Sequence, residues 1–136
     1  MSVEENKALV RQFNEEAWNG HDVKARDNYL GPNFAINGTV VDPVRSRQRF
    51  ASVFTAFPDF HRTKEDTIAE GDRVVARYTA TGTHDGEFMG VPPTGKKVKF
   101  SWITIYRIAD GKIAEEWLLF DQLGLLQQLG ALKPFE

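Results

Sequence analysis

The sequence of 136 residues contains no cysteine. This absence excludes disulfides, thiolate catalysis and cysteine-ligated zinc or iron–sulfur sites. The chain also lacks any hydrophobic run near the roughly 20 residues that a membrane-spanning helix needs. Its first residues, MSVEENKALVRQF, contain no apolar signal core. Together these absences predict a cytoplasmic protein that does not associate with membranes.

The chain also has no excess of basic residues. The 17 Lys and Arg residues against 19 Asp and Glu residues give a net charge of −2, which argues against nucleic-acid binding. Hydrophobic residues make up 41% and charged residues 26%, an ordinary globular composition, and the length indicates one domain over residues 1–136. Aromatic residues are plentiful at 12%, as a pocket for a small molecule would require.

The first half of the chain has helical periodicity. Apolar residues recur at helical spacing over residues 3–18, and Ser2 with Glu5 forms a capping-box pattern at the start. A short helix is expected at 23–29 and a longer one at 45–57, where the following proline ends it.

The second half changes to the period-two pattern of strands. Strands are expected at 60–70, 73–84, 97–108 and 112–120, before a last helix at 122–130. Asp110-Gly111 is the strongest hairpin signal in the chain. Because helices and strands are segregated along the sequence, we expect an α+β fold with a mostly antiparallel, strongly curved sheet.

Several segments resemble one known family. These are FPDFH at 57–61, GDRVVAR at 71–77, GTHDGEFMGVPPTGK at 82–96, YRIADGKI at 106–113, and the stretch from Glu115 through Asp121 to LGLLQQLG at 123–130. They are similar to the SnoaL-like polyketide cyclases, also called ester cyclases, in the superfamily typified by nuclear transport factor two. The resemblance extends over nearly the whole chain.

This resemblance implies a cone, in which the N-terminal helices pack into the concave side of a curved antiparallel sheet and leave a deep pocket. It implies a homodimer or homotetramer formed through the outer face of the sheet. It also implies an intramolecular aldol cyclisation that needs neither a metal nor a cofactor.

Asp121 is the first candidate for a catalytic acid/base, because the family has an aspartate four residues after a tryptophan at this place. Period two puts five residues on one strand face: Ile113, Glu115, Trp117, Leu119 and Asp121. Burial of the carboxylate beside Trp117 and Leu119 would raise its pKa. The alternative is that Asp121 only caps the last helix.

His84 is the second candidate for the catalytic machinery. It begins a long loop at 85–96 and is either a second acid/base or a loop residue that bonds to the backbone. The three histidines, at 21, 61 and 84, have no short ligand spacing, so no metal site is expected.

The substrate-binding candidates are aromatic or apolar side chains, each of which could instead belong to the core. They are Trp18, Tyr29, Phe34, Phe50, Phe54, Phe88, Met89, Trp102, Tyr106 and Trp117. On the inner face of strand 97–108 we count only Thr104 and Tyr106 as hydrogen-bonding groups. This favours an apolar pocket with a single acid/base.

Three functions remain open from the sequence. The first is a cofactor-independent acid/base enzyme acting on an apolar carbonyl compound, such as a polyketide ester that cyclises by an aldol reaction. The second is an enzyme resembling epoxide hydrolases or ketosteroid isomerases, for which Arg77, Arg107 and Asp121 would have to cluster. The third is a small-molecule binding module without catalysis, since fold alone does not decide function.

Overall fold

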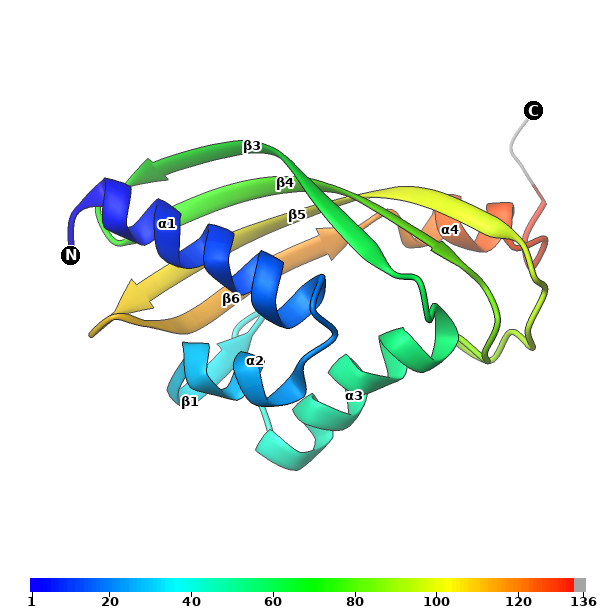
Figure 1. Ribbon diagram of the computed structural model, residues 1–136, viewed down its shortest axis with the longest axis horizontal. Helices are drawn as coiled ribbons and strands as arrows, with labels where there is room; N and C mark the ends of the chain where they lie inside the picture. Colours follow the sequence, from blue (N-terminus) through cyan, green and yellow to red (C-terminus); the bar gives the residue numbers. More distant parts are fainter. Residues whose placement is uncertain (134–136) are drawn as a thin grey trace.

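The computed structural model describes residues 1–133. It consists of a curved six-stranded sheet with helices covering one face (Figure 1). The strands are β1 (Leu30–Ile36), β2 (Thr39–Val40), β3 (His61–Glu70), β4 (Arg73–Thr83), β5 (Lys97–Ala109) and β6 (Lys112–Phe120). The helices are α1 (Val3–Phe13), the π-helical turn η1 (Asn14–Trp18), α2 (Val23–Tyr29), α3 (Pro43–Ala56) and α4 (Gln122–Gln128). The α+β class predicted from the sequence is confirmed.

The strand order is β2-β1-β6-β5-β4-β3, and the sheet is mixed. Strands β3, β4, β5 and β6 form antiparallel pairs, as expected, whereas β1 runs parallel to β6. Helices α1, α2 and α3 lie against the concave face, and α4 lies beyond the end of β6 (Figure 1). In the part of the chain that the structure describes, no helix is long and apolar enough to cross a membrane.

The predicted elements agree with the structure to within a few residues. The Ser2 hydroxyl accepts a hydrogen bond from the Glu5 N–H at 3.1 Å, and the Glu5 carboxylate accepts one from the Ser2 N–H at 3.1 Å. Such a cap stabilises a helix by about 1 kcal/mol. The predicted first helix changes to π-helical winding in its last turn, which carries Trp18.

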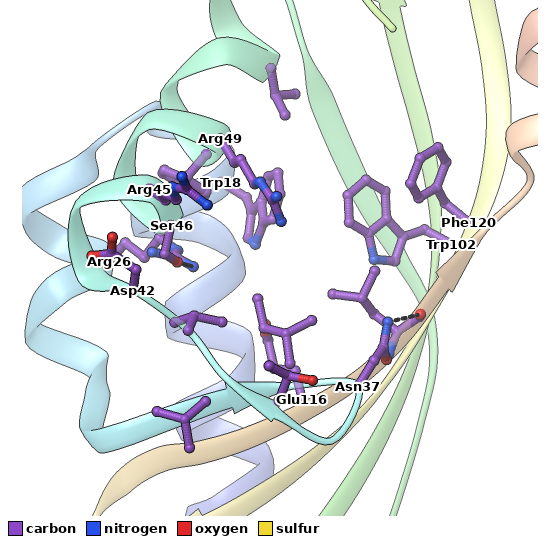
Figure 2. A pocket seen from close by; sticks show the side chains of 17 residues that line it. Trp18, Arg26, Asn37, Asp42, Arg45, Ser46, Arg49, Trp102, Glu116 and Phe120 are labelled. Carbon is purple, nitrogen blue, oxygen red and sulfur yellow. Dashed lines mark hydrogen bonds between the residues drawn. The ribbon is translucent and has the colours of Figure 1, made fainter.

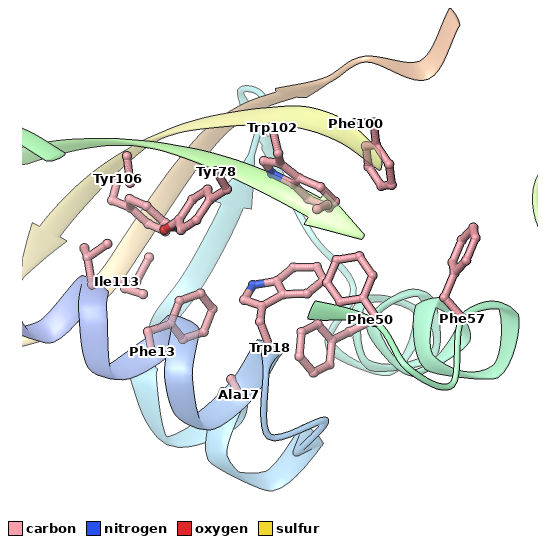
Figure 3. Packing of buried hydrophobic residues seen from close by; sticks show 14 of the residues in the cluster. Phe13, Ala17, Trp18, Phe50, Phe57, Tyr78, Phe100, Trp102, Tyr106 and Ile113 are labelled. Carbon is pink, nitrogen blue, oxygen red and sulfur yellow. Dashed lines mark hydrogen bonds between the residues drawn. The ribbon is translucent and has the colours of Figure 1, made fainter. Parts of the chain in front are cut away.

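The core lies between the helices and the concave face of the sheet. The predicted alternation of β5 is confirmed, because every second residue from Val98 to Ile108 is buried. Trp18 packs edge-on against Phe50 at 4.7 Å and Trp102 at 5.1 Å between ring centres (Figure 3). Phe13 contacts Tyr106 in the same way at 6.2 Å, so the first helix is held on the sheet by aromatic rings.

One extra residue in β6 changes which of its side chains face the core. The hairpin turn at Asp110 and Gly111 has positive φ angles of 52° and 72°, as the sequence predicted for this pair. Beyond it, Ile113 pairs with Ile108 but Glu115 pairs with Arg107, so Ala114 is a β-bulge.

The bulge overturns the predicted strand face of β6. Ile113 and Glu116 are buried on the concave side, whereas Trp117 and Leu119 are exposed on the convex side. The prediction that Ile113 shares a face with the other four residues was therefore wrong, because a strict period of two does not continue through a bulge. Glu115, Trp117, Leu119 and Asp121 do share a face, but it is the convex one.

Candidate functional site

A cavity of about 780 Å³ opens between α3, the turn after β1, and the inner faces of β5 and β6. This volume is in the range of pockets that hold small organic molecules. Its apolar walls include Phe50 and Val53 from α3 and Leu118 and Phe120 from β6. Figure 2 shows α3 on one side of the cavity and Trp102 with Phe120 on the other.

Glu116 is the buried carboxylate of the cavity wall. The bulge at Ala114 turns its side chain inward, where only 6% of the residue is exposed. Burial raises the pKa of the Glu116 carboxyl above its ordinary value, and the charges of Arg26 and Arg62 oppose this shift in part. A carboxyl with a raised pKa suits general acid/base catalysis near neutral pH.

The backbone around Glu116 is fixed by the turn after β1. The Asn37 N–H donates to the Glu116 carbonyl oxygen at 2.9 Å. The Asn37 side chain accepts from the Leu118 N–H at 2.9 Å and donates to the Leu118 carbonyl oxygen at 3.3 Å (Figure 2). Asn37 has a positive φ of 50°, a conformation that asparagine tolerates better than most residues. The cavity wall is thus held from outside the hairpin that contains Glu116.

Arg26 is the buried cation of the cavity lining. It comes from α2, and its guanidinium donates to the Ser46 hydroxyl at 2.8 Å. The same guanidinium lies 5.0 Å from the ring centre of Phe50 and 5.6 Å from that of Phe34. Burial lowers the pKa of Arg26, and the charge of Glu116 counters that effect. Arg26 and Glu116 therefore compensate one another across the cavity floor.

Arg62 forms a second buried cation behind the cavity lining. Its Nε donates to the Asn14 side chain at 2.7 Å, and its Nη2 donates to the Tyr106 hydroxyl at 3.3 Å. The guanidinium lies 3.7 Å from the ring centre of Tyr78, whose hydroxyl is 2.7 Å from that of Tyr106. Burial raises the pKa of both tyrosines, so they remain protonated hydrogen-bonding groups.

Two indole N–H groups are buried at the cavity without a partner. Trp18 is 8% and Trp102 is 7% exposed, and both residues line the cavity. Among the described residues, neither Nε1 atom has a hydrogen-bond acceptor. Buried donors are almost always paired, so an acceptor that reached either N–H group, such as a carbonyl oxygen, would gain a hydrogen bond. The sequence reasoning had missed the N–H of Trp102 when it counted the polar groups of β5.

The structure divides the predicted substrate-binding residues into three groups. Trp18, Phe50 and Trp102 line the cavity. The core holds Phe34 and Tyr106 as buried members, with Tyr29 and Phe54 packed against it. The others lie elsewhere: Phe88 packs on Phe57, Met89 is exposed in the loop, and Trp117 is exposed on the outer face.

The two predicted catalytic residues are outside this cavity lining. Asp121 is exposed, and its carboxylate caps α4 by accepting from the Gly124 N–H at 2.9 Å. His84 is fully buried, and its Nδ1 accepts from the Thr94 N–H at 3.2 Å, which holds the loop after β4 in place. Catalytic roles for these residues stay predictions.

The two arginines considered for an epoxide-hydrolase-like site, Arg77 and Arg107, form ion pairs with acids other than Asp121. Arg77 pairs with Asp66 at 2.7 Å, and Arg107 pairs with Glu115 at 3.3 Å. Within residues 1–133, no group of three His, Asp or Glu residues is arranged to hold a metal ion.

Sequence reasoning missed Glu116 and Arg26 as site residues. For Glu116 a signal existed, since adjacent glutamates on a strand point to opposite faces and one of them must face inward. Arg26 shares the inward face of α2 with Val23 and Tyr29 at a spacing of three residues, but sequence alone does not single it out, because an arginine is rarely fully buried.

Comparison with known proteins places this chain in a family. The sequence profile of the SnoaL-like polyketide cyclases matches residues 8–129. The nogalonic acid methyl ester cyclase of Streptomyces nogalater is 31% identical over 123 residues, which is 90% of this chain and 92% of that protein. The aklanonic acid methyl ester cyclase AcmA of Streptomyces galilaeus is 31% identical over 138 residues, or 97% and 95% of the two chains.

A solved structure agrees with these sequence matches. AclR, a suggested hydroxylase from Streptomyces galilaeus, superimposes with a TM-score of 0.89 at 34% identity, covering 99% of this chain and 87% of AclR. The profile match and the two relatives give the same family, and the AclR structure has the same fold. This chain belongs to the SnoaL-like polyketide cyclase family.

Proposed function

We propose that this protein is an acid/base enzyme that cyclises an apolar carbonyl compound by an intramolecular aldol reaction, with Glu116 as the base. The observation that carries this proposal is the buried carboxylate of Glu116 in the wall of a large cavity. Family membership supports it, because the two curated relatives are described as methyl ester cyclases. The reaction needs no redox step and therefore no cofactor.

The proposed reaction starts with proton transfer to Glu116. A carbon flanked by two carbonyl groups loses its proton to the carboxylate, and the electron pair moves onto a carbonyl oxygen. That enolate oxygen accepts hydrogen bonds from the indole N–H groups of Trp18 and Trp102. Fixed donors directed at a developing oxyanion lower the barrier more than they stabilise the ground state.

Ring closure then returns the proton. The enolate carbon attacks a ketone carbon of the same molecule, which forms the new carbon–carbon bond and leaves a negative charge on the ketone oxygen. That oxygen takes the proton from the Glu116 carboxylic acid, and the carboxylate is regenerated. The apolar walls at Phe50, Leu118 and Phe120 would hold the substrate folded for this attack.

The convex face of the sheet supports a proposal on assembly. Apolar side chains of β5 and β6 are exposed there, including Ile103, Ile105, Trp117 and Leu119, with 79% of Leu119 accessible. Contiguous apolar patches of this kind usually mark an interface. We therefore propose that two copies of the chain associate through this face. A cytoplasmic location stays a prediction.

The first prediction separates the two candidate bases. E116Q should lower the rate of exchange of the activated proton of a β-keto ester by about 100-fold or more, because general-base catalysis is lost. D121N should have little effect, since asparagine also caps a helix. Deuterium exchange followed by NMR measures both, with E115Q as the control for a neighbouring carboxylate. Loss in D121N with full rate in E116Q would contradict the assignment.

The second prediction concerns the indole donors. W102F removes the N–H but keeps an aromatic ring, and it should slow the same exchange by about tenfold or more. W117F makes the equivalent change on the convex face and should leave the rate unchanged. Equal rates for W102F and wild type would show that this N–H is not used.

The third prediction follows from the raised pKa of Glu116. The folded state holds the proton at pH values where the unfolded carboxyl, with its ordinary pKa of 4.5, has already lost it. Stability from this group is thus fully present below the unfolded pKa and is lost as pH rises through the folded pKa. E116Q should therefore gain stability over wild type as pH rises through this window, measured by urea unfolding. A difference that shrinks with rising pH would contradict the pKa direction.

The fourth prediction tests the convex face. L119K should convert a dimer into a monomer, because a lysine charge would be buried in the interface. Light scattering after size exclusion measures the mass. V44K places the same charge on an exposed apolar position of α3 and should leave the dimer intact. A monomeric wild type at every concentration would exclude this interface.

A further inference from the structure

The cavity has two exposed arginines on its α3 side. Arg45 and Arg49 both line the cavity, and both are exposed to solvent. They are four residues apart on α3, so their side chains lie on the same face of the helix one turn apart. In Figure 2 both side chains come from α3, across the cavity from Trp102 and Phe120. Two guanidinium groups thus flank one side of the cavity.

Neither arginine is paired with an acid in the part of the chain that the structure describes. The ion pairs closer than 4 Å involve Lys7, Arg47, Arg77 and Arg107, but not Arg45 or Arg49. Arg47, between them in sequence, pairs with Asp27 at 2.9 Å and is absent from the lining of this cavity. One helix therefore carries paired and unpaired arginines on different faces.

Among the described residues, the carboxylates of the cavity form no ion pair with Arg45 or Arg49. Asp42 accepts a hydrogen bond from the Val44 N–H at 3.1 Å as the N-cap of α3. Glu116 is buried, and its charge is countered by Arg26 and Arg62. The protein as a whole has a net charge of −2, so the local positive charge does not reflect the overall composition.

We propose that the occupant of the cavity is an apolar acid whose carboxylate is bound by Arg45 and Arg49. The proposal deepens the proposed function and rests on it for the carbonyl chemistry of the substrate. Guanidinium groups bind carboxylates through parallel hydrogen bonds, which sets the orientation as well as the affinity. The apolar body of the ligand then reaches the walls at Phe50 and Phe120, with its carbonyl oxygens near the indole donors.

This arrangement would distinguish a free acid from its ester. The curated relatives are described as methyl ester cyclases, and an esterified carboxyl group has no charge for an arginine to bind. Loss of charge-assisted hydrogen bonds at a partly exposed site weakens binding by about tenfold or more. Because both arginines are exposed, added salt should weaken the acid's binding as well.

The test uses a matched pair of probes, anthraquinone-2-carboxylate and its methyl ester, with calorimetric titration of the wild-type protein. The wild type should bind the acid about tenfold more tightly than the ester, and the R45Q/R49Q variant should lose this preference. The variant should keep its affinity for the ester, which checks that the cavity is intact. R47Q removes the paired arginine of the same helix and should behave as wild type.

Equal affinities of the wild type for acid and ester, no binding of the acid, or equal behaviour of R45Q/R49Q and R47Q would overturn the proposal. These outcomes are separate from the proposed catalysis, because the titration measures no turnover. Loss of proton exchange in E116Q together with equal binding of acid and ester would reject the carboxylate site alone. Acid preference without any effect of E116Q on exchange would reject the base alone.

Discussion

The β-bulge at Ala114 determines which side chains of β6 line the cavity. Without the extra residue, the alternation of β6 would place Glu115 where Glu116 now lies. The indole of Trp117 would then face the concave side instead of the convex side. With the bulge, the inward-facing carboxylate is that of Glu116, and Leu118 and Phe120 follow it on the same wall in place of Trp117 and Leu119. A bulge in a strand is a common way to redirect a side chain near a functional site.

A buried carboxylate in such a position requires nearby positive charge. Arg26 and Arg62 provide it from opposite sides of the concave face, and each is held by polar and aromatic neighbours rather than by a direct ion pair. Neither guanidinium forms an ion pair within 4 Å of the Glu116 carboxylate among the described residues. Glu116 can therefore keep a raised pKa and still be available to a ligand.

The fold was largely predictable from the sequence, whereas the site was only partly so. Period-two alternation identified β5, and the Asp110-Gly111 signal identified its hairpin, because both depend on local chemistry. The bulge is defined by the pairing of β6 with β5, and Asn37 from the turn after β1 holds the strand beyond it; no local pattern reveals either feature. For this reason the acid of β6 that faces the cavity was missed, although the aromatic lining of Trp18, Phe50 and Trp102 was predicted.

The central claim is that Glu116 is a desolvated carboxyl group within reach of a ligand. Carbon-13 NMR of the side-chain carboxyls, titrated with pH and assigned by the E116Q variant, tests this claim directly. The Glu116 resonance should titrate above the ordinary value of 4.5 and should shift when an apolar ligand is added. A Glu116 resonance that titrates at or below 4.5 and does not respond to ligand would contradict it.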